Sequence, residues 1–196
     1  MLVHHYLEFY ARNTPDSPCF SHHETTMSYR EVNDVANQLG NGFLNLGVQK
    51  EQRVAILGEN SIEHGLLFMA ASKVGAVAVP LNYRLAPAEL AFIIGDSNTR
   101  ALLVLAGMEA TLDALRPQLP PDIAMTSPSV EVDKDEPFLQ LYTSGTTGNP
   151  KGVVTSHFNV LQLTMMNIIA TPRRPDAGTA GILCAPMFHI GGAGSV

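Results

Sequence analysis

Residues 143–151 have the composition of an anion-binding loop. The segment combines hydroxyl side chains, glycines and one lysine: Thr143, Ser144, Gly145, Thr146, Thr147, Gly148 and Lys151. Glycine lets the backbone approach a ligand closely, hydroxyls donate hydrogen bonds, and the ammonium group supplies positive charge, which are the properties that phosphate oxygens require. Because Gly, Ser, Thr and Asn-Pro are also common turn residues, an ordinary polar hairpin loop is the alternative.

The spacing around the lysine excludes two well-known phosphate-binding patterns. Lys151 follows Pro150 and precedes Gly152, whereas a Walker A lysine follows glycine and precedes Ser or Thr at the start of a helix. A GxGxxG dinucleotide fingerprint is also absent. Residues 138–142 alternate like a strand and residues 152–155 are again extended in pattern, so the loop is predicted to join two strands.

Histidine 189 is the second candidate, within the segment Pro-Met-Phe-His-Ile-Gly-Gly at residues 186–192. A lone histidine beside two apolar residues is more often a packing residue, although a neutral imidazole can donate one hydrogen bond near pH 7. We expect the other histidines to be surface residues (His4, His5, His22 and His23) or structural ones (His64 and His157).

The elements around these residues predict an α/β fold. Apolar runs at 54–57, 76–79 and 101–105 read as buried parallel strands, with crossover helices over about 61–74 and after Pro87. Glu59, Asn60 and Ser61 lie where a strand gives way to a helix, which suits ligand groups, but helix capping explains them at least as well. A further strand is predicted at 181–185 and a helix after Ser156.

The amino-terminal part is predicted to be helical with one hairpin. Leu2, Tyr6, Phe9 and Tyr10 recur at roughly helical spacing and predict a docking helix over 2–12. A short hairpin follows at 19–27. The clearest helix then begins at Ser28, with Glu31 in the capping-box position, and ends before Gly47 (residues 28–47).

Composition limits the classes of function. The chain has 196 residues, is 45% hydrophobic, and carries a net charge of −6 with only 12 Lys and Arg, which argues against a nucleic-acid surface. It contains neither 18 consecutive apolar residues nor a secretory leader, so we expect a cytoplasmic protein without an integral membrane span. Cys19 and Cys184 lack metal-ligand spacing and are expected to be reduced, partly buried thiols, with no metal site.

Residues 142–152, Tyr-Thr-Ser-Gly-Thr-Thr-Gly-Asn-Pro-Lys-Gly, resemble the signature loop of the adenylate-forming superfamily, which includes acyl-CoA synthetases and other AMP-dependent CoA ligases. Segments 28–31, 53–57, 73–82 and 186–192 are similar to family landmarks in family order. The resemblance implies layered, mostly parallel β-sheets flanked by helices, and an incomplete amino-terminal part of the family's large domain. Within 1–196 we expect a first unit at 1–116, a Pro-rich acidic linker at 117–137, and the phosphate-loop and acyl-gate segment at 138–196.

The resemblance also implies an activity. A carboxylate and ATP would form acyl-AMP and pyrophosphate, and coenzyme A would then accept the acyl group. Thr143, Ser144, Gly145, Thr146, Thr147, Gly148 and Lys151 would bind ATP together with Mg²⁺, with Lys151 and Thr143 acting in catalysis. His189 would line the acyl pocket and position or gate the carboxylate. The partners implied are a small carboxylate, ATP and CoA, and a homodimer is left open.

Several parts of such an enzyme have no counterpart in these 196 residues, among them the aspartate on the ribose and the carboxy-terminal domain. We therefore expect an amino-terminal fragment of an acyl- or aryl-CoA ligase that is inactive alone. The alternatives are an adenylation domain of the peptide-synthetase type and a short, non-catalytic nucleotide- or acyl-binding protein. The sequence does not indicate which acid is used.

Overall fold

The computed structural model describes residues 2–119, 135–143, 149–170, 181, 183, 185–189 and 193. In chain order the elements are α1 (Val3–Asn13), β1 (Pro18–His22), β2 (Thr25–Ser28), α2 (Tyr29–Asn45), β3 (Arg53–Leu57), α3 (Ile62–Val74), β4 (Val77–Leu81), α4 (Pro87–Asp96), β5 (Thr99–Val104), α5 (Glu109–Leu115), the 3-10 helix η1 (Arg116–Gln118), β6 (Pro137–Thr143), β7 (Lys151–Ser156) and α6 (His157–Ala170). No helix in these ranges is long and apolar enough to cross a membrane.

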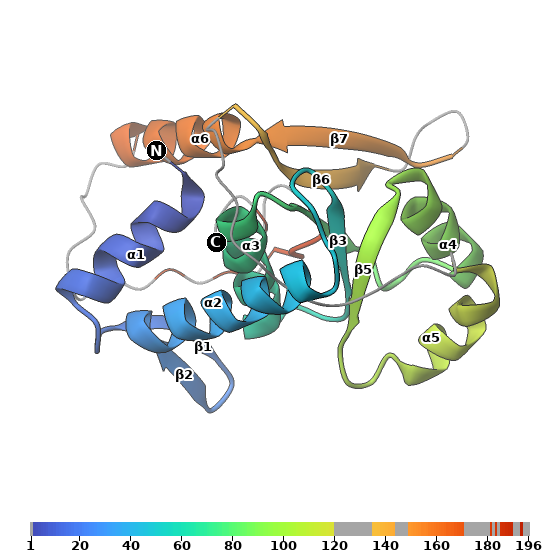
Figure 1. The fold of residues 1–196 in the computed structure, drawn as a ribbon, viewed down its shortest axis with the longest axis horizontal. Coiled ribbons are helices and arrows are strands. Elements are labelled where there is room, and N and C mark those ends of the chain that lie inside the picture. The colour runs from blue at the N-terminus through green and yellow to red at the C-terminus, as the bar shows by residue number, and fades with distance from the viewer. Residues whose placement is uncertain are drawn as a thin grey trace.

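The main sheet has five strands in the order β5-β3-β4-β6-β7 (Figure 1). The first four strands are parallel, and β7 runs antiparallel to β6. The chain steps from β3 to β4 in one direction and from β4 back past β3 to β5 in the other. Because such crossovers are right-handed, α3 and α4 must cover opposite faces of the sheet. The predicted α/β class with a mostly parallel sheet is therefore confirmed.

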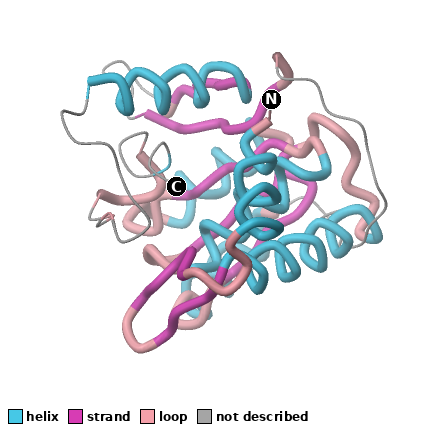
Figure 2. Tube along the Cα trace, turned by 90° about the vertical axis from the view of Figure 1, so that its left-hand side faces the viewer, coloured by secondary structure: helices cyan, strands magenta, loops and turns pink. Residues whose placement is uncertain are grey.

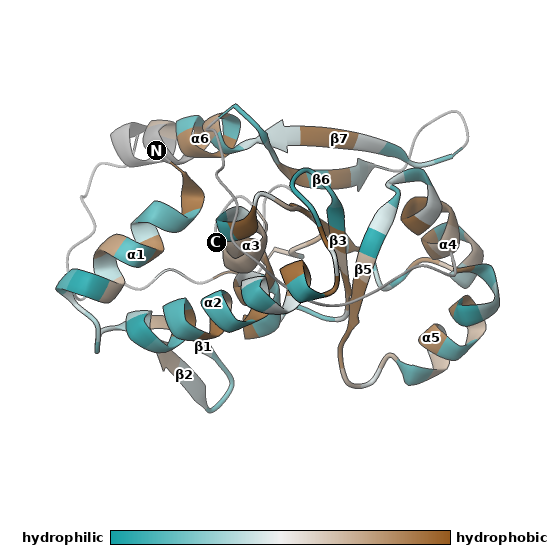
Figure 3. Ribbon diagram, in the orientation of Figure 1, coloured by the Kyte–Doolittle hydropathy of each residue, from teal (hydrophilic) through white to brown (hydrophobic). Residues whose placement is uncertain are grey.

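Each face of the sheet has its own apolar core. Val54 and Ile56 of β3 pack on the face covered by α1, α2, α3 and α6, whereas Ala55 and Leu57 pack on the face covered by α4 and α5. Side chains alternate between the faces of a strand, so a strand buried on both sides must be apolar throughout. This explains the continuous hydrophobic runs, which are brown along the strands in Figure 3.

The predicted α2 helix and its neighbouring hairpin are confirmed. The Ser28 side chain accepts a hydrogen bond from the backbone N–H of Glu31, and the Glu31 carboxylate accepts one from the backbone N–H of Ser28 at 2.8 Å. The two interactions form a capping box at the helix start. Val32, Ala36 and Phe43 then face the core. The β1–β2 hairpin projects from this helical side of the molecule (Figure 2).

The amino-terminal helix exists as predicted, but it docks through a different face. Its buried residues are Val3, His4 and Leu7, whereas the aromatic residues expected to dock are exposed, with Phe9 at 54%. His4 was expected at the surface and is buried, because Ser72 of α3 accepts a hydrogen bond from its backbone N–H and lies 2.8 Å from its Nδ1. A partner inside the core outweighed the tendency of histidine to stay in water.

Two other parts of the chain differ from the sequence-based expectation. Residues 181, 183 and 185, the described part of the predicted strand at 181–185, do not form a strand. The short helix α5 was not predicted; it is followed directly by η1, which ends at Gln118. Most of the predicted linker at 117–137 lies outside the described residues.

Candidate functional site

The β6–β7 hairpin brings the two ends of the candidate phosphate loop together. Thr143, the last residue of β6, lies opposite Lys151, the first residue of β7. Both residues are exposed, and Lys151 forms no salt bridge within the described part of the chain. The expected strand–loop–strand arrangement is confirmed. Residues 144–148 lie outside the described residues, so the roles of Ser144, Gly145, Thr146, Thr147 and Gly148 stay predictions.

A chain of side-chain hydrogen bonds runs across one face of this hairpin. Arg53 Nε donates to Gln140 Oε1 at 2.9 Å, Gln140 Nε2 donates to Tyr142 Oη at 3.0 Å, and Tyr142 Oη donates to Asp96 Oδ2 at 2.6 Å. Burial, together with the hydrogen bond to the Asp96 carboxylate, raises the pKa of Tyr142. The phenol therefore stays protonated at neutral pH and donates to Asp96.

A second cluster holds the segment that contains His189. The Asn60 side chain bridges two backbone groups of this segment, because its Nδ2 donates to the Ala185 carbonyl and its Oδ1 accepts from the Met187 N–H, both at 2.9 Å. Met187 and Phe188 are buried. The His189 backbone N–H donates to the Pro186 carbonyl at 3.0 Å, and its imidazole is exposed beside Phe188.

This cluster lies where the chain reverses direction across the sheet. Asn60 follows the end of β3, and Tyr83 follows the end of β4 and meets the Phe188 ring edge-on at 5.9 Å. The connections after β3 and β4 lead to opposite faces, and the carboxyl edge at such a switch point is where open α/β sheets place ligands. The segment with His189 is therefore attached at the expected ligand-binding edge.

The phosphate-loop ends and the His189 segment are held by separate sets of contacts. β6 runs parallel to β4, so Thr143 at its end lies toward the carboxyl edge of the sheet, whereas the Tyr142 hydroxyl reaches Asp96 at the end of α4. In Figure 1 this end of β6 and β7 lies beside α4. No hydrogen bond or ring contact among the described residues joins the two groups.

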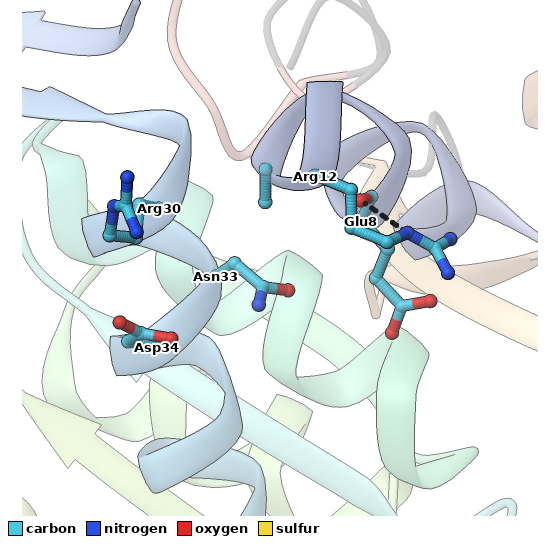
Figure 4. A pocket seen from close by; sticks show the side chains of 6 residues that line it. Glu8, Arg12, Arg30, Asn33 and Asp34 are labelled. Carbon is cyan, nitrogen blue, oxygen red and sulfur yellow. Dashed lines mark hydrogen bonds between the residues drawn. The ribbon is translucent and has the colours of Figure 1, made fainter. Parts of the chain in front are cut away.

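A cleft of about 270 Å³ opens between α1 and α2, away from both groups (Figure 4). Arg30 pairs with Asp16 at 3.0 Å, and Glu8 pairs with Lys73 at 2.7 Å. The Arg12 and Arg30 side chains point in different directions in Figure 4, so they do not converge on one ligand. The cleft is lined by Glu8, Ala11, Arg12, Arg30, Asn33 and Asp34.

Two of the remaining histidines, His64 and His157, act in packing. His64 and His157 are buried, as expected for structural residues, and the His157 ring lies 4.9 Å from the Phe138 ring. The described residues include no group of three or more His, Cys, Asp or Glu side chains that could hold a metal ion. Cys19 is a half-buried free thiol, as expected, whereas Cys184 lies outside the described residues.

Sequence reasoning left the role of Asn60 open and missed Tyr83. Asn60 was one of three residues read either as helix caps or as ligand groups; Ser61 occupies the N-cap position, and the amide of Asn60 binds a segment 125 residues away in sequence. Its position shortly after a buried strand singled it out, but its partner in segment 185–189 has no local signal. No local pattern marks Tyr83, because its partner Phe188 is distant in sequence.

Comparisons with known proteins agree on one family. The family model described as "AMP-binding enzyme" matches residues 7–196. The chain is 38% identical to long-chain-fatty-acid–CoA ligase FadD13 of Mycobacterium tuberculosis over 85% of this chain and 36% of that protein. It is 32% identical to a feruloyl-CoA synthase of an Amycolatopsis species over 95% of this chain and 39% of that protein. It therefore spans less than two fifths of either relative.

Among solved structures, the inhibitor-bound amino-terminal domain of FACL13 from M. tuberculosis superposes with a TM-score of 0.83 and 31% identity. The match covers 99% of this chain and 53% of that one. The likeness thus includes the five-stranded sheet, the β6–β7 hairpin and the attached segment 185–189.

Proposed function

The chain belongs to the family of AMP-binding enzymes, and we propose that it forms the amino-terminal part of an ATP-dependent ligase that activates a carboxylic acid as acyl-AMP. The observation that carries this proposal is the hairpin that sets Thr143 opposite Lys151 at the two ends of the hydroxyl- and glycine-rich loop. A strand–loop–strand hairpin with a lysine at its exit suits the polyphosphate of ATP, because it offers hydroxyls, backbone amides and one cation together.

In the proposed first step a carboxylate oxygen attacks the α-phosphorus of ATP. A bond forms between that oxygen and phosphorus, the bond to the bridging oxygen breaks, and pyrophosphate leaves. Negative charge grows on the leaving group, so Lys151 and the Thr143 hydroxyl stabilise the transition state, with residues 144–148 supplying further donors. Such transfers depend on positioning and charge stabilisation, and Mg²⁺ bound to ATP would supply part of the positive charge that stabilises the leaving pyrophosphate.

For the acyl group we propose the carboxyl edge of the sheet. His189 is exposed there beside the Phe188 ring, which in turn meets the Tyr83 ring, and its segment is fixed by Asn60. An aromatic wall beside one hydrogen-bonding imidazole suits a carboxylic acid with an apolar tail. In the first step the hairpin would then bind the leaving pyrophosphate and this edge the attacking carboxylate, on opposite sides of the α-phosphorus, with the ribose and CoA contacts supplied elsewhere in the enzyme.

Coenzyme A is the acceptor that we propose for the second step, in which its thiol attacks the acyl-AMP carbonyl and AMP leaves. The relatives FadD13 and feruloyl-CoA synthase are named for a fatty-acid and an aryl substrate, so both kinds of acid belong among the candidates. A peptide-synthetase type of enzyme would instead pass the acyl group to a carrier-protein thiol.

The test is ATP–pyrophosphate exchange with the longest natural polypeptide that contains this sequence. A panel of long-chain fatty acids, cinnamic-type acids and amino acids should give exchange with at least one of the first two groups, followed by thioester formation with CoA. Exchange with amino acids alone would favour the peptide-synthetase alternative. ATP binding without ATP–pyrophosphate exchange in the presence of any acid would favour the alternative of a non-catalytic nucleotide- or acyl-binding protein. We expect the 196-residue chain alone to form no acyl-CoA.

A further inference from the structure

We propose that Gln140, Tyr142 and Asp96 are positioning residues: they hold the backbone at Gly152 and thereby fix the position of the neighbouring Lys151. Their hydrogen bonds connect the hairpin to the parallel part of the sheet and to the end of α4. The consequence for catalysis rests on the proposed function, whereas the consequence for the hairpin's position does not.

The hairpin needs such a connection because few backbone bonds hold it to the sheet. β6 pairs with β4 through one register pair, Ala78 with Leu139, whereas β3 and β4 pair along five. β7 is the edge strand of the sheet, and Val153 and Val154 are exposed at 53% and 47%. Apolar packing of Leu139 and Leu141 holds one face of β6. The side-chain hydrogen bonds hold the other face.

Each hydrogen bond in this side-chain network orients the partner of the next one. Arg53 is itself oriented, because its Nη1 donates to the Glu51 carbonyl at 2.9 Å while its Nε holds Gln140. Gln140 is 6% exposed, so its amide has little water as an alternative partner. The Tyr142 hydroxyl accepts from Gln140 and donates to the Asp96 carboxylate, a charged acceptor that gives the stronger kind of hydrogen bond.

Gly152 transmits this arrangement to the lysine. It lies opposite Tyr142 in the ladder, and a Cβ on it would come within 2.5 Å of Gln140 Nε2 and 3.0 Å of Tyr142 Cζ. The β7 backbone therefore rests directly on these two side chains. Gln140 could move away only by breaking its hydrogen bonds. The Gln140 amide and the Tyr142 phenol therefore fix the distance of the β7 backbone from their side chains at Gly152, one residue after Lys151.

The first experiment measures the position of the hairpin without any activity. Backbone amide hydrogen exchange of residues 151–156 is followed in the longest natural polypeptide, unaltered and as Tyr142→Phe, which removes only the hydroxyl. We expect exchange about ten-fold faster in β7, corresponding to the loss of a hydrogen bond to a charged group, with β3 and β4 unchanged. Tyr6→Phe is the matched control, because it removes the same atom from an exposed tyrosine on α1.

The second experiment asks whether the position matters for ATP. In ATP–pyrophosphate exchange, Tyr142→Phe and Gly152→Ala should lower kcat/KM for ATP about ten-fold while leaving the KM for the carboxylic acid within two-fold. Asp96→Asn keeps an acceptor for the phenol and should retain more activity than Asp96→Ala. A purely structural role would instead lower the amount of folded enzyme and leave kinetics per folded molecule unchanged.

Unaltered amide hydrogen exchange in β7 of Tyr142→Phe overturns the proposal. An equal loss of kcat/KM for ATP and for the carboxylic acid overturns it as well. If the unaltered polypeptide shows no ATP–pyrophosphate exchange with any acid, the proposed function fails. The amide hydrogen-exchange result alone then decides whether these residues hold the hairpin.

Discussion

Mild acid should unfold this chain, because three histidines are buried as neutral imidazoles. His4, His64 and His157 are 8%, 1% and 0% exposed. Burial lowers the pKa of each to about 4 from the usual 6.5, against the opposing effect of a nearby carboxylate. His157 is the extreme case, since neither ring nitrogen has a hydrogen-bond partner among the described residues.

The sign of the effect follows from proton binding. Above pH 6.5 these imidazoles are neutral in both states, and pH has little effect through them. As the pH falls from 6.5 to 4, the unfolded chain binds protons that the folded chain does not, so stability falls. A shift of this size corresponds to about 3 kcal/mol for each histidine. Three such groups together reach about 9 kcal/mol, which lies within the roughly 5–15 kcal/mol that stabilises a whole domain.

Urea unfolding followed by circular dichroism at pH 7.5, 6.5, 5.5 and 4.5 tests this prediction. We expect a steep loss of unfolding free energy below pH 6.5 and a slope reduced by about a third in His157→Phe, which keeps an aromatic ring against Phe138. His23→Asn is the control, because it removes an exposed histidine at a positive φ that asparagine tolerates. A free energy that stays level between pH 7.5 and 5 would refute the reasoning.

Two further predictions concern packing and the His189 segment. Gly65→Ala should lower the unfolding free energy by about 1–3 kcal/mol, because the new Cβ would lie 2.7 Å from Phe20 Cε2. The matched variant Gly42→Ala, with nothing within 4 Å, should raise it by about 0.5–1 kcal/mol, and equal effects in a urea titration would contradict the packing argument. Asn60→Ala should cost about 1–3 kcal/mol and speed proteolysis near residues 185–189, because the buried Met187 N–H loses its acceptor. Asn45→Ala, at an exposed helix end, should do neither; intact resistance to proteolysis in Asn60→Ala would contradict the anchoring role.

The periodicity of the sequence predicted the elements whose signals are local. The capping box at Ser28, the apolar runs of β3 and β5, and the strands on either side of the phosphate loop all depend on neighbouring residues. The docking face of α1 could not be predicted in this way, because both Leu7 and Phe9 are apolar and only the position of α2 and α3 decides which one is buried.

The candidate site shows the same division. The composition of residues 143–151 predicted a phosphate loop between strands, and the strands are present. The attachment of the His189 segment by Asn60, and the contact of Tyr142 with Asp96, join residues 125 and 46 positions apart. Such contacts depend on strand order, which the sequence of one chain does not specify. The β5-β3-β4 order determines that the loops after β3 and β4 meet.

The most direct test of the central claim is ATP–pyrophosphate exchange by the longest natural polypeptide carrying Lys151→Ala. Loss of one group that stabilises the leaving pyrophosphate should lower the exchange rate by about 100-fold or more, with little change in carboxylate binding. Lys50→Ala is the control, because this lysine pairs with Glu136 at 2.6 Å and has no part in the proposed reaction. Exchange by Lys151→Ala at the unaltered rate would contradict the assignment of residues 143–151 as the pyrophosphate-binding loop.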